Sequence, residues 1–412
     1  MKCIVHGDIV LSRPPEGPLA AQIGAFAKWA SEQGYARYSR YRQVLLAAGF
    51  SRWLGQQAIR VRRVSSDQLS RYLRSRARRV RRHSGDAAAL IQFIDFLRCR
   101  RAIPAETVAP RRRTPVAQEG EAFARYLRDE RALADATIVN YVPFIRDFLT
   151  GRFGTGPVAL SRLCVGDVVG FVQRQASRLH RTRAKLLTSA LRSFLHYVRC
   201  RGDVALDLAA AVPSVANWSM TSIPRAIPAD SVRQLLASIS RRTATGRRDY
   251  AIVLLLARLG LRASEVVFLE LDDIDWAAGQ VSVRGKGRQR SALPLPADVG
   301  TAIAAYLRHG RPRSTSRRVF LRVHAPIRGF LGASAIGSLV RQALVRADVS
   351  APTKGAHQFR HALATQMLRH GASLTEIGEV LRHRSPQTTM IYAKVDLDAL
   401  RTLALPWPGG AR

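Results

Sequence analysis

The stretch His-Gln-Phe-Arg-His at residues 357–361 decides how the last third of the chain is interpreted. His357, Arg360 and His361 have the spacing i, i+3, i+4, which places an imidazole and a guanidinium on one face of a helix that continues through Leu368. Two histidines four residues apart would also suit half of a zinc site. However, Gln358 stands where a zinc protease would carry glutamate, and no third ligand is evident. We therefore expect a cationic face here rather than a metal site.

Two further helix signals follow this stretch. Ser-Leu-Thr-Glu at residues 373–376 is a capping box that starts a helix ending near Leu381. His383 follows the end of that helix. Ser385 then caps another helix, with proline at its first position, and Tyr392 lies two turns into it. The order and proximity of these residues favour one shared functional site over separate structural roles.

An apolar helix over residues 249–259 ends at Gly260, which can adopt the left-handed capping conformation. Arg262 follows at once, and Ser264 starts the next helix. An arginine at such a junction is held by packing on both sides, which suits a phosphate clamp. The alternative is that Arg262 merely pairs with Glu265.

Residues 280–284 and 290–295 alternate like two paired strands around a Gly-Lys-Gly turn. Lys286 in this turn is the only lysine between Lys185 and Lys354, a span otherwise supplied with arginine. Lysine can release a proton that arginine retains, so the residue is a candidate proton donor. An ordinary surface lysine in a turn is the alternative.

The composition points to a polyanionic partner. The chain has 412 residues, 66 lysines and arginines against 29 acidic residues, and a formal charge of +37. Clustered cations gain free energy by releasing counterions from nucleic acid. No segment approaches 18 consecutive apolar residues, which disfavours a membrane span. Four widely spaced cysteines without a Cys-x-x-Cys pair, and no secretory leader, predict a reduced intracellular protein with packing cysteines. They are Cys3, Cys99, Cys164 and Cys200.

Two proline-bearing linkers at residues 104–116 and 213–228 divide the chain. The segments 1–103 and 117–212 show a helical pattern. Residues 229–405 are mixed and are followed by a tail at 406–412. The predicted fold class is mainly α, with a small β-hairpin in the third domain, that is, α+β.

The first two segments are similar to each other. Residues 90–100 match residues 191–201 at a constant offset of 101, and Leu, Phe, Arg, Cys and Arg recur identically. Phe-Ala-Lys-Trp at 26–29 also resembles Phe-Ala-Arg-Tyr at 123–126. Duplication predicts two small helical domains, whereas the alternative is coincidence between amphipathic helices. Residues 74–82 hold six arginines and are either a solvated helix face or a phosphate track.

Taken together, these motifs resemble the active site of the tyrosine recombinase family, the phage integrase type, over roughly residues 225–405. Two departures are Phe359, where leucine is commoner, and Arg382, where glycine usually precedes the histidine; Arg382 could alter how His383 is held. The matching positions are Arg262, Lys286, His357, Arg360, His383 and Tyr392.

The resemblance implies a site-specific DNA recombinase or integrase that needs neither metal, ATP nor another cofactor. Tyr392 would attack the scissile phosphate and form a 3′-phosphotyrosine. Arg262 and Arg360 would hold the non-bridging oxygens, while Lys286 would protonate the leaving 5′-oxygen. His357 and His383 would add hydrogen bonds, with His357 a candidate for assisting deprotonation of the tyrosine.

The resemblance also implies that residues 117–205 form a helical clamp on DNA, with residues 1–103 a second copy of it or an arm domain. The expected partners are double-stranded DNA, three further copies of the chain on two duplexes, and accessory recombinase or DNA-bending proteins, but no membrane. The expected location is the cytoplasm, at the nucleoid. Integration, excision, transposition of a mobile element and dimer resolution would share this chemistry. The tail carries leucines that could dock on a neighbouring subunit, namely Leu397, Leu400 and Leu403.

Three alternatives remain open at this point. A type IB topoisomerase shares the chemistry but only relaxes supercoils. A DNA-binding protein with an inactive site would keep only the basic surface. A metal-dependent transposase would use a cluster of acidic residues that solvent exposure otherwise explains, namely Glu270, Asp272, Asp273 and Asp275.

Overall fold

The computed structural model describes residues 3–81, 83–105, 114–215, 223–285, 290–395 and 400. Its contacts group the chain into two compact units, Met1–Glu106 with Ser222–Arg412, and Thr107–Thr221. Large clusters of buried apolar side chains lie within residues 9–103, 116–212 and 227–359, and a small fourth cluster includes Tyr392. Parts of both predicted linkers, 106–113 and 216–222, lie outside the described residues.

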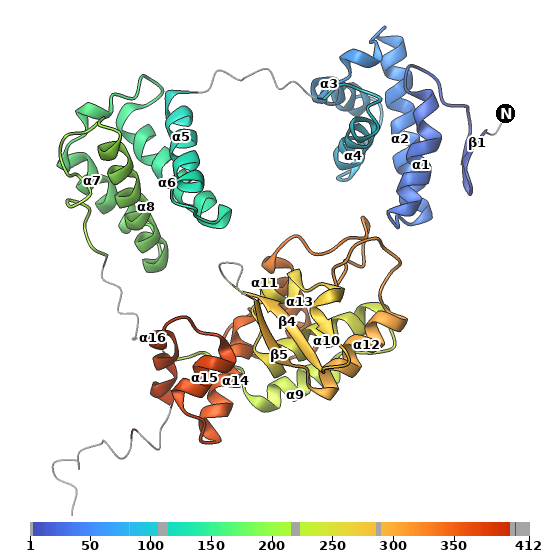
Figure 1. Ribbon diagram of the computed structural model, residues 1–412. Helices are drawn as coiled ribbons and strands as arrows, with labels where there is room; N and C mark the ends of the chain where they lie inside the picture. Colours follow the sequence, from blue (N-terminus) through green and yellow to red (C-terminus); the bar gives the residue numbers. More distant parts are fainter. Residues whose placement is uncertain are drawn as a thin grey trace, which may run out of the picture. The chain divides into compact units, whose positions relative to one another are not determined.

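The N-terminal domain consists of four α-helices preceded by a hairpin, and is coloured blue in Figure 1. The hairpin was not predicted, although Ile9 and Leu11 are buried and Val10 between them is exposed, the alternation of a half-buried strand. The elements are β1 (Cys3–His6), β2 (Ile9–Leu11), α1 (Ala20–Glu32), α2 (Arg37–Gln56), the 3-10 helix η1 (Val61–Arg63), α3 (Ser66–Ala77) and α4 (Asp86–Cys99).

The middle domain is a bundle of four α-helices, coloured from teal to green in Figure 1. Its core is rich in phenylalanine. Its first helix starts with Pro115 directly after Thr114, whose hydroxyl accepts a hydrogen bond from the amide of Ala117 at 3.2 Å. The elements are α5 (Pro115–Asp129), α6 (Asp135–Phe153), the 3-10 helix η2 (Leu160–Arg162), α7 (Val165–Ala176) and α8 (Arg181–Cys200).

The C-terminal domain is mainly helical with one small sheet, as predicted for the fold class. Its helices are α9 (Ala229–Ser238), α10 (Ala244–Leu259), α11 (Ala263–Phe268), η3 (Leu271–Asp273), α12 (Ala297–His309), α13 (Ala333–Arg346), α14 (His357–Arg369), α15 (Leu374–Leu381), α16 (Pro386–Thr389) and η4 (Met390–Val395). Its strands are β3 (Ile274–Asp275), β4 (Gln280–Arg284) and β5 (Arg290–Pro294).

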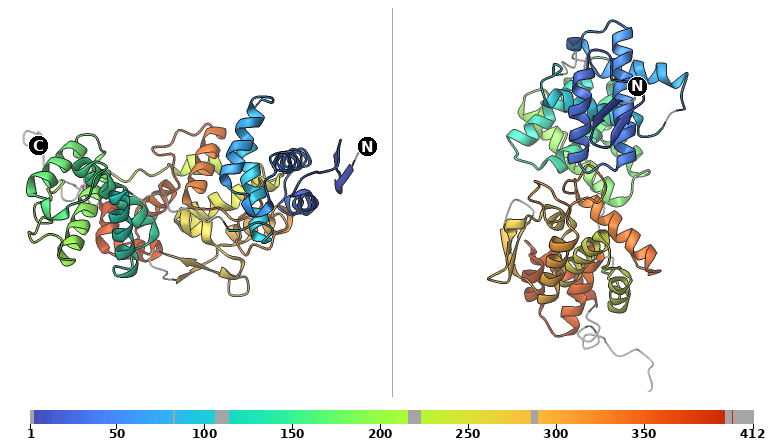
Figure 2. Two further views of the ribbon diagram at one scale, coloured as in Figure 1. Left: turned by 90° about the horizontal axis from the view of Figure 1, so that it is seen from above. Right: turned by 90° about the vertical axis from the view of Figure 1, so that its right-hand side faces the viewer.

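The predicted hairpin is confirmed and gains a third strand. β4 pairs antiparallel with both β3 and β5, and Val281 faces Leu293 across the second pair. Val281 and Val283 point into the core, so the sheet lies against the helices on one face. Figure 2 shows the hairpin of β4 and β5 in yellow at the edge of its domain. Its tip, residues 286–289, lies outside the described residues, and Lys286 with it.

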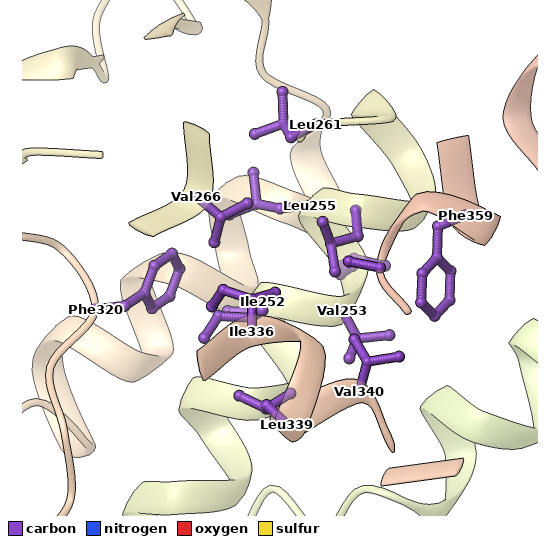
Figure 3. Packing of buried hydrophobic residues seen from close by; sticks show 14 of the residues in the cluster. Ile252, Val253, Leu255, Leu261, Val266, Phe320, Ile336, Leu339, Val340 and Phe359 are labelled. Atoms are coloured by element: carbon purple, nitrogen blue, oxygen red, sulfur yellow. The ribbon is translucent and has the colours of Figure 1, made fainter. Parts of the chain in front are cut away.

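Helix α10 is the central element of the C-terminal core. Its residues 251–256 are all buried, and Ile252, Val253 and Leu255 are surrounded by side chains from several other helices (Figure 3). Phe359 on α14 belongs to the same cluster and is fully buried. This packing fixes α14, which carries the His-Gln-Phe-Arg-His stretch, against the helix that ends at Gly260.

Two predictions about side-chain environment are wrong. Cys99, Cys164 and Cys200 are exposed rather than packed in cores. Each lies at one end of a helix and not on its buried face. Asp273 is buried, not solvent-exposed, because the η3 turn directs it towards Arg284. None of the described helices combines the length and the apolar composition that a membrane crossing requires.

Gly246 in the first turn of α10 tests how strictly this helix is positioned. A Cβ atom there would lie 1.7 Å from the backbone oxygen of Ser240. We expect Gly246→Ala to lower the free energy of unfolding by about 1–3 kcal/mol, since the chain must shift to relieve the overlap. Gly337→Ala in α13, where a Cβ would meet nothing within 4 Å, is the matched control. It should be neutral or stabilising by about 1 kcal/mol.

Thermal unfolding of the full-length chain, combined with hydrogen exchange of the α10 amides, measures both variants. Equal stability of Gly246→Ala and Gly337→Ala would show that the backbone at the start of α10 can shift to accommodate a Cβ atom at little cost.

Candidate active site

Arg262 reaches the site from the junction between α10 and α11. The predicted left-handed cap at Gly260 is confirmed, with φ of 56°, and it turns the chain so that Arg262 becomes the N-cap of α11. The backbone amide of Arg262 donates to Oε2 of Glu265 at 2.8 Å. This closes the N-terminus of α11 and sets the direction in which the Arg262 side chain leaves the backbone.

Arg360 lies in the first turn of α14, and only 1% of its surface is exposed. Its Nη1 donates to the carbonyl oxygen of Gly260 at 2.8 Å, and its Nη2 donates to the carbonyl oxygen of Leu381. The guanidinium therefore joins the ends of α10 and α15. Two of its five N–H donors are used in these bonds, which leaves the others for a ligand.

Burial first, and then the nearby cations Arg262 and Arg382, together lower the pKa of Arg360 to about 10. The group still carries its charge at neutral pH. A lowered pKa for a buried cation means that positive charge is under-compensated at this place. An anion bound beside Arg360 would relieve that imbalance.

The carboxylate of Glu265 is shared between two arginines. Its Oε1 accepts from Nη1 of Arg262 at 2.9 Å, and its Oε2 accepts from Nη2 of Arg382 at 2.9 Å. The side chain of Glu265 is 1% exposed. The alternative that Arg262 pairs with Glu265 is thus observed. One carboxylate between two guanidiniums still leaves one positive charge in this group.

Arg382 adopts the left-handed conformation, with φ of 54°, at the end of α15. An L-residue there costs about 1–2 kcal/mol relative to the right-handed region. The ion pair with Glu265 and a bond from Nη1 to the carbonyl oxygen of Val380 at 3.1 Å offset this strain. The residue before His383 is therefore anchored through its side chain, where glycine would rely on backbone freedom alone.

His361, rather than His357, contacts the tyrosine. Nδ1 of His361 lies 3.0 Å from the phenol oxygen of Tyr392, while the ring of His357 packs edge-on against the ring of His361 with centroids 4.6 Å apart. Tyr392 is 2% exposed. Burial raises the pKa of the phenol to about 12, against the lowering effect of Arg360. The phenol is therefore protonated at neutral pH in this conformation.

The predicted helix around Tyr392 is wrong in part. Helix α16 starts at Pro386 as predicted but ends after one turn at Thr389, and Tyr392 lies in the following 3-10 helix η4. The hydroxyl of Ser385 bonds to the side chain of Gln387 instead of capping a backbone amide. The changed path turns Tyr392 back towards α14. By contrast, the helix from His357 and the capping box of α15 are confirmed.

The three histidines of the site, His357, His361 and His383, are held in the neutral form. Burial lowers the pKa of His383 to about 4, with Arg360 and Arg262 adding to the effect. Burial, then His357 and Arg360, likewise lower the pKa of His361 to about 4. The pKa of His357 is also lowered, first by burial and then by Arg360. Nδ1 of His383 lies 2.7 Å from the hydroxyl of Thr389, and its ring stacks parallel to Tyr392 with centroids 6.5 Å apart.

The structure thus brings together five of the six predicted site residues, and the sixth, Lys286, lies outside the described residues. Sequence reasoning missed three contributors, namely His361 as the partner of the phenol, Glu265 as the link between two arginines, and Thr389. The spacing of His361 from His357 and of Glu265 from Arg262 could have indicated the first two. Nothing in the sequence marked Thr389.

Three of the four acidic residues proposed for a metal-dependent alternative pair with arginines, while Oδ1 of the fourth, Asp275, accepts from the backbone amides of Ala277 and Ala278. Nη2 of Arg284 lies 2.6 Å from Oε2 of Glu270 and 3.5 Å from Oδ1 of Asp273, and Asp272 pairs with Arg317. Within the described ranges, no three His, Cys, Asp or Glu side chains are grouped so as to hold a metal ion.

Replacing Arg382 separates backbone strain from side-chain anchoring. Arg382→Gly removes the strain of the left-handed conformation but also removes a buried partner of Glu265. We expect a net loss of about 1–2 kcal/mol in the free energy of unfolding. Arg101→Gly is the matched control, because Arg101 is exposed and has φ of 56°. It should gain up to about 1 kcal/mol.

Hydrogen exchange in the domain that carries each substitution measures the two effects. A gain in stability for Arg382→Gly would show that the bridge to Glu265 contributes less than the strain costs.

Two known families match the chain. The phage integrase family matches residues 225–398, and the phage integrase N-terminal SAM-like domain matches residues 121–202. The putative integrase/recombinase y4rA of Sinorhizobium fredii (strain NBRC 101917 / NGR234) is 58% identical over 412 residues, which is 100% of both chains. Tyrosine recombinase XerD of Listeria monocytogenes serotype 4b (strain F2365) is 31% identical over 288 residues, covering 67% of this chain and 93% of that protein.

Solved structures share the fold. XerH site-specific recombinase bound to the palindromic difH substrate aligns with a TM-score of 0.56 at 18% identity, over 76% of this chain and 94% of that one. A lambda integrase dimer bound to a COC′ core site aligns with a TM-score of 0.52 at 15% identity, over 67% and 94% of the respective chains. With the sequence matches, these findings confirm the resemblance: the chain belongs to the phage integrase family of tyrosine recombinases and is a site-specific DNA recombinase.

Proposed function

We propose that the chain cuts and rejoins DNA through a covalent 3′-phosphotyrosine at Tyr392, without metal or ATP. The observation that carries this proposal is the 3.0 Å contact between the Tyr392 phenol and His361, beside the buried cation Arg360. A protonated phenol needs a proton acceptor before it can attack, and a neutral imidazole is already in place. The adjacent guanidiniums supply the charge that a phosphodiester requires.

The reaction proceeds by in-line displacement. The phenol oxygen of Tyr392 forms a bond to phosphorus while the phenol proton passes to Nδ1 of His361. The bond from phosphorus to the 5′-oxygen breaks, and Lys286 gives that oxygen a proton. Because the phosphotyrosine ester retains the energy of the broken bond, a 5′-hydroxyl from a partner duplex reverses the step and rejoins the strand.

The arginines bind the two non-bridging oxygens. Arg360 keeps three N–H donors that its bonds to Gly260 and Leu381 do not use. Arg262 is 34% exposed in its side chain, so it can turn towards a ligand while Glu265 keeps hold of its backbone amide. Donors that are fixed before the substrate arrives stabilise the charge that grows in the pentacoordinate transition state.

The histidines act as neutral hydrogen-bond donors. When the hydroxyl of Thr389 donates to Nδ1 of His383, the proton of the neutral ring lies on Nε2. That N–H is then available for a phosphate oxygen. His357, whose ring packs against His361, orients the acceptor of the phenol proton and contributes its own N–H to the phosphate.

The buried phenol must become accessible when DNA binds. Tyr392 belongs to a small apolar cluster with Ala364, Ile377 and Leu381, separate from the main core around α10. A shift of η4 would expose the phenol oxygen at the cost of this small cluster only. Cleavage by Tyr392 would then depend on occupancy of the site by a phosphodiester.

The proposed partners are double-stranded DNA and three further copies of the chain on two duplexes. The charge of +37 supports binding to DNA. A solved lambda integrase tetramer bound to a Holliday junction has the same fold, with a TM-score of 0.52 at 14% identity. Exchange between duplexes is what separates this proposal from a topoisomerase, which relaxes supercoils without exchanging partners.

Tyr392→Phe tests the nucleophile. We expect this variant to bind duplex DNA with unchanged affinity but to form no complex that survives denaturant. The substrate is a nicked suicide duplex taken from DNA that the purified protein protects. Tyr250→Phe, in α10, removes a phenol elsewhere in the same domain and should trap DNA like the wild type. Covalent trapping by Tyr392→Phe would remove Tyr392 from its role, and relaxation without joining of two duplexes would favour a topoisomerase.

The pH dependence of cleavage tests the role of His361. The acceptor must be neutral, so the single-turnover rate should fall as the pH drops through the pKa of His361. That pKa is about 4 without DNA, and bound phosphate raises it towards the ordinary value of 6.5. His361→Asn should cleave about 10²-fold more slowly and lose this acid limb, since an amide does not titrate. His357→Asn should be slower but keep the limb; the opposite pattern would assign the base to His357.

A further inference from the structure

After its hairpin, the N-terminal domain has the same sequence of helices as the middle domain. Each has two α-helices, a 3-10 helix of three residues, an α-helix of 12 residues and a final α-helix, α1–α4 with η1 and α5–α8 with η2. η1 and η2 are offset by 99 residues, and α3 and α7 by the same number. The SAM-like family match covers residues 121–202 and does not extend to the first domain.

Corresponding aromatic side chains make the same contacts in both domains. In the first, Phe26 packs against Phe93 with ring centroids 4.8 Å apart, and Trp29 against Phe96 at 5.7 Å. In the second, Phe123 packs against Phe194 at 5.3 Å, and Tyr126 against Tyr197 at 4.7 Å. These are the positions that the sequence comparison aligned at offsets of 97 and 101.

A second aromatic pair, on other helices, repeats as closely. Phe50 of α2 lies 5.3 Å from Tyr72 of α3 at an interplanar angle of 52°. Phe148 of α6 lies 5.2 Å from Phe171 of α7 at 59°. Two amphipathic helices can share a spacing by chance, but coincidence does not readily reproduce contacts between different helices at offsets that stay between 97 and 101 residues. The packing therefore favours duplication over coincidence.

An arginine at the end of the last helix repeats as well. The guanidinium of Arg100 lies 5.7 Å from the ring centre of Phe96, and that of Arg201 lies 5.1 Å from the ring centre of Tyr197. Core contacts and one surface contact thus correspond. These correspondences favour one shared arrangement of the four α-helices in the two domains.

The first copy is much the more basic of the two. Residues 1–105 contain 20 lysines and arginines against six acidic residues, whereas residues 114–215 contain 14 against nine. Both copies carry arginines in the turn between the third and fourth helices or in the first turn of the fourth helix. In the second copy this turn leads to Arg181 and Arg183, which are exposed. In the first it holds the arginine run that follows α3.

Within that run, Arg76 is bound inward. Its Nη1 lies 3.0 Å from Oδ2 of Asp86, which also binds Arg42 at 3.1 Å. Asp86 thereby fixes the turn to α2. Arg78, Arg79 and Arg81 lie beyond the end of α3 and are exposed. A fixed turn that presents several guanidiniums to solvent suits the phosphates of a duplex backbone.

We propose that residues 20–103 are a second copy of the helical clamp and bind double-stranded DNA through the phosphates, using Arg78, Arg79 and Arg81. Because these contacts are to phosphates, they position DNA without reading its sequence. The segment of duplex bound here is additional to the segment held at Tyr392. The proposal goes beyond the cleavage reaction and does not depend on it.

The test compares Arg78→Gln/Arg79→Gln with a control that removes the same charge from the same domain. The control is Arg62→Gln/Arg63→Gln in η1, at the opposite end of α3, about 18 Å away along the helix. The full-length chain is titrated with a duplex of about 30 base pairs and one about twice as long, over a range of salt concentrations.

We expect the first variant to lose affinity for the long duplex and its salt slope to fall by about 1.8, or 0.9 per phosphate contact. The control should change little. Arg78→Lys/Arg79→Lys, which keeps the charge, should restore binding and guards against an effect of misfolding.

Equal affinities and slopes for the first variant, the control and the wild type would overturn the proposal. Covalent trapping on the short duplex is measured in parallel. If the wild type traps DNA covalently but Arg78→Gln/Arg79→Gln binds the long duplex as well as the wild type does, the second clamp alone is refuted. If the wild type traps no DNA covalently, only the cleavage mechanism is refuted.

Discussion

The buried guanidinium of Arg360 is the constraint on which the rest of the site depends. A fully buried cation is costly unless dipoles or counter-charges surround it. Here the carbonyl oxygens of Gly260 and Leu381 accept its hydrogen bonds, and both lie at helix C-termini, where the helix dipole is negative. Arg360 is therefore held by dipoles and not by a carboxylate. Its charge stays available to a ligand, whereas a paired arginine would already be neutralised.

The nearby charged residues leave the charge of Arg360 unpaired. Glu265 is the nearby acid, but it is divided between Arg262 and Arg382, so it does not cancel Arg360. Burial first, and then the positive charge around them, keeps the pKa values of His361 and His383 low, so both rings are neutral. A neutral His361 can accept a proton from Tyr392, which an imidazolium could not do. In the proposed mechanism, the same electrostatic imbalance favours binding of a phosphodiester and, together with burial, preserves the proton acceptor.

Local features of the site could be predicted from the sequence, because they are set by neighbours. The helix from His357, the capping box at Ser373 and the left-handed Gly260 each depend on a few adjacent residues. The pairing of His361 with Tyr392 could not, because it depends on α16 ending after one turn. Likewise the partner of Arg382 is 117 residues away in sequence, and only the tertiary fold brings it there.

The proposed duplication accounts for what the two helical domains share and for where they differ. Aromatic positions in the core recur because interiors are close-packed, so a change at one contact disturbs its neighbours. Surface positions carry no such restraint, and there the copies differ in charge. The N-terminal domain carries an arginine run beyond α3, while Asp86 holds the turn that presents it. Binding of a polyanion, as proposed above, would account for both the excess charge and the anchored turn.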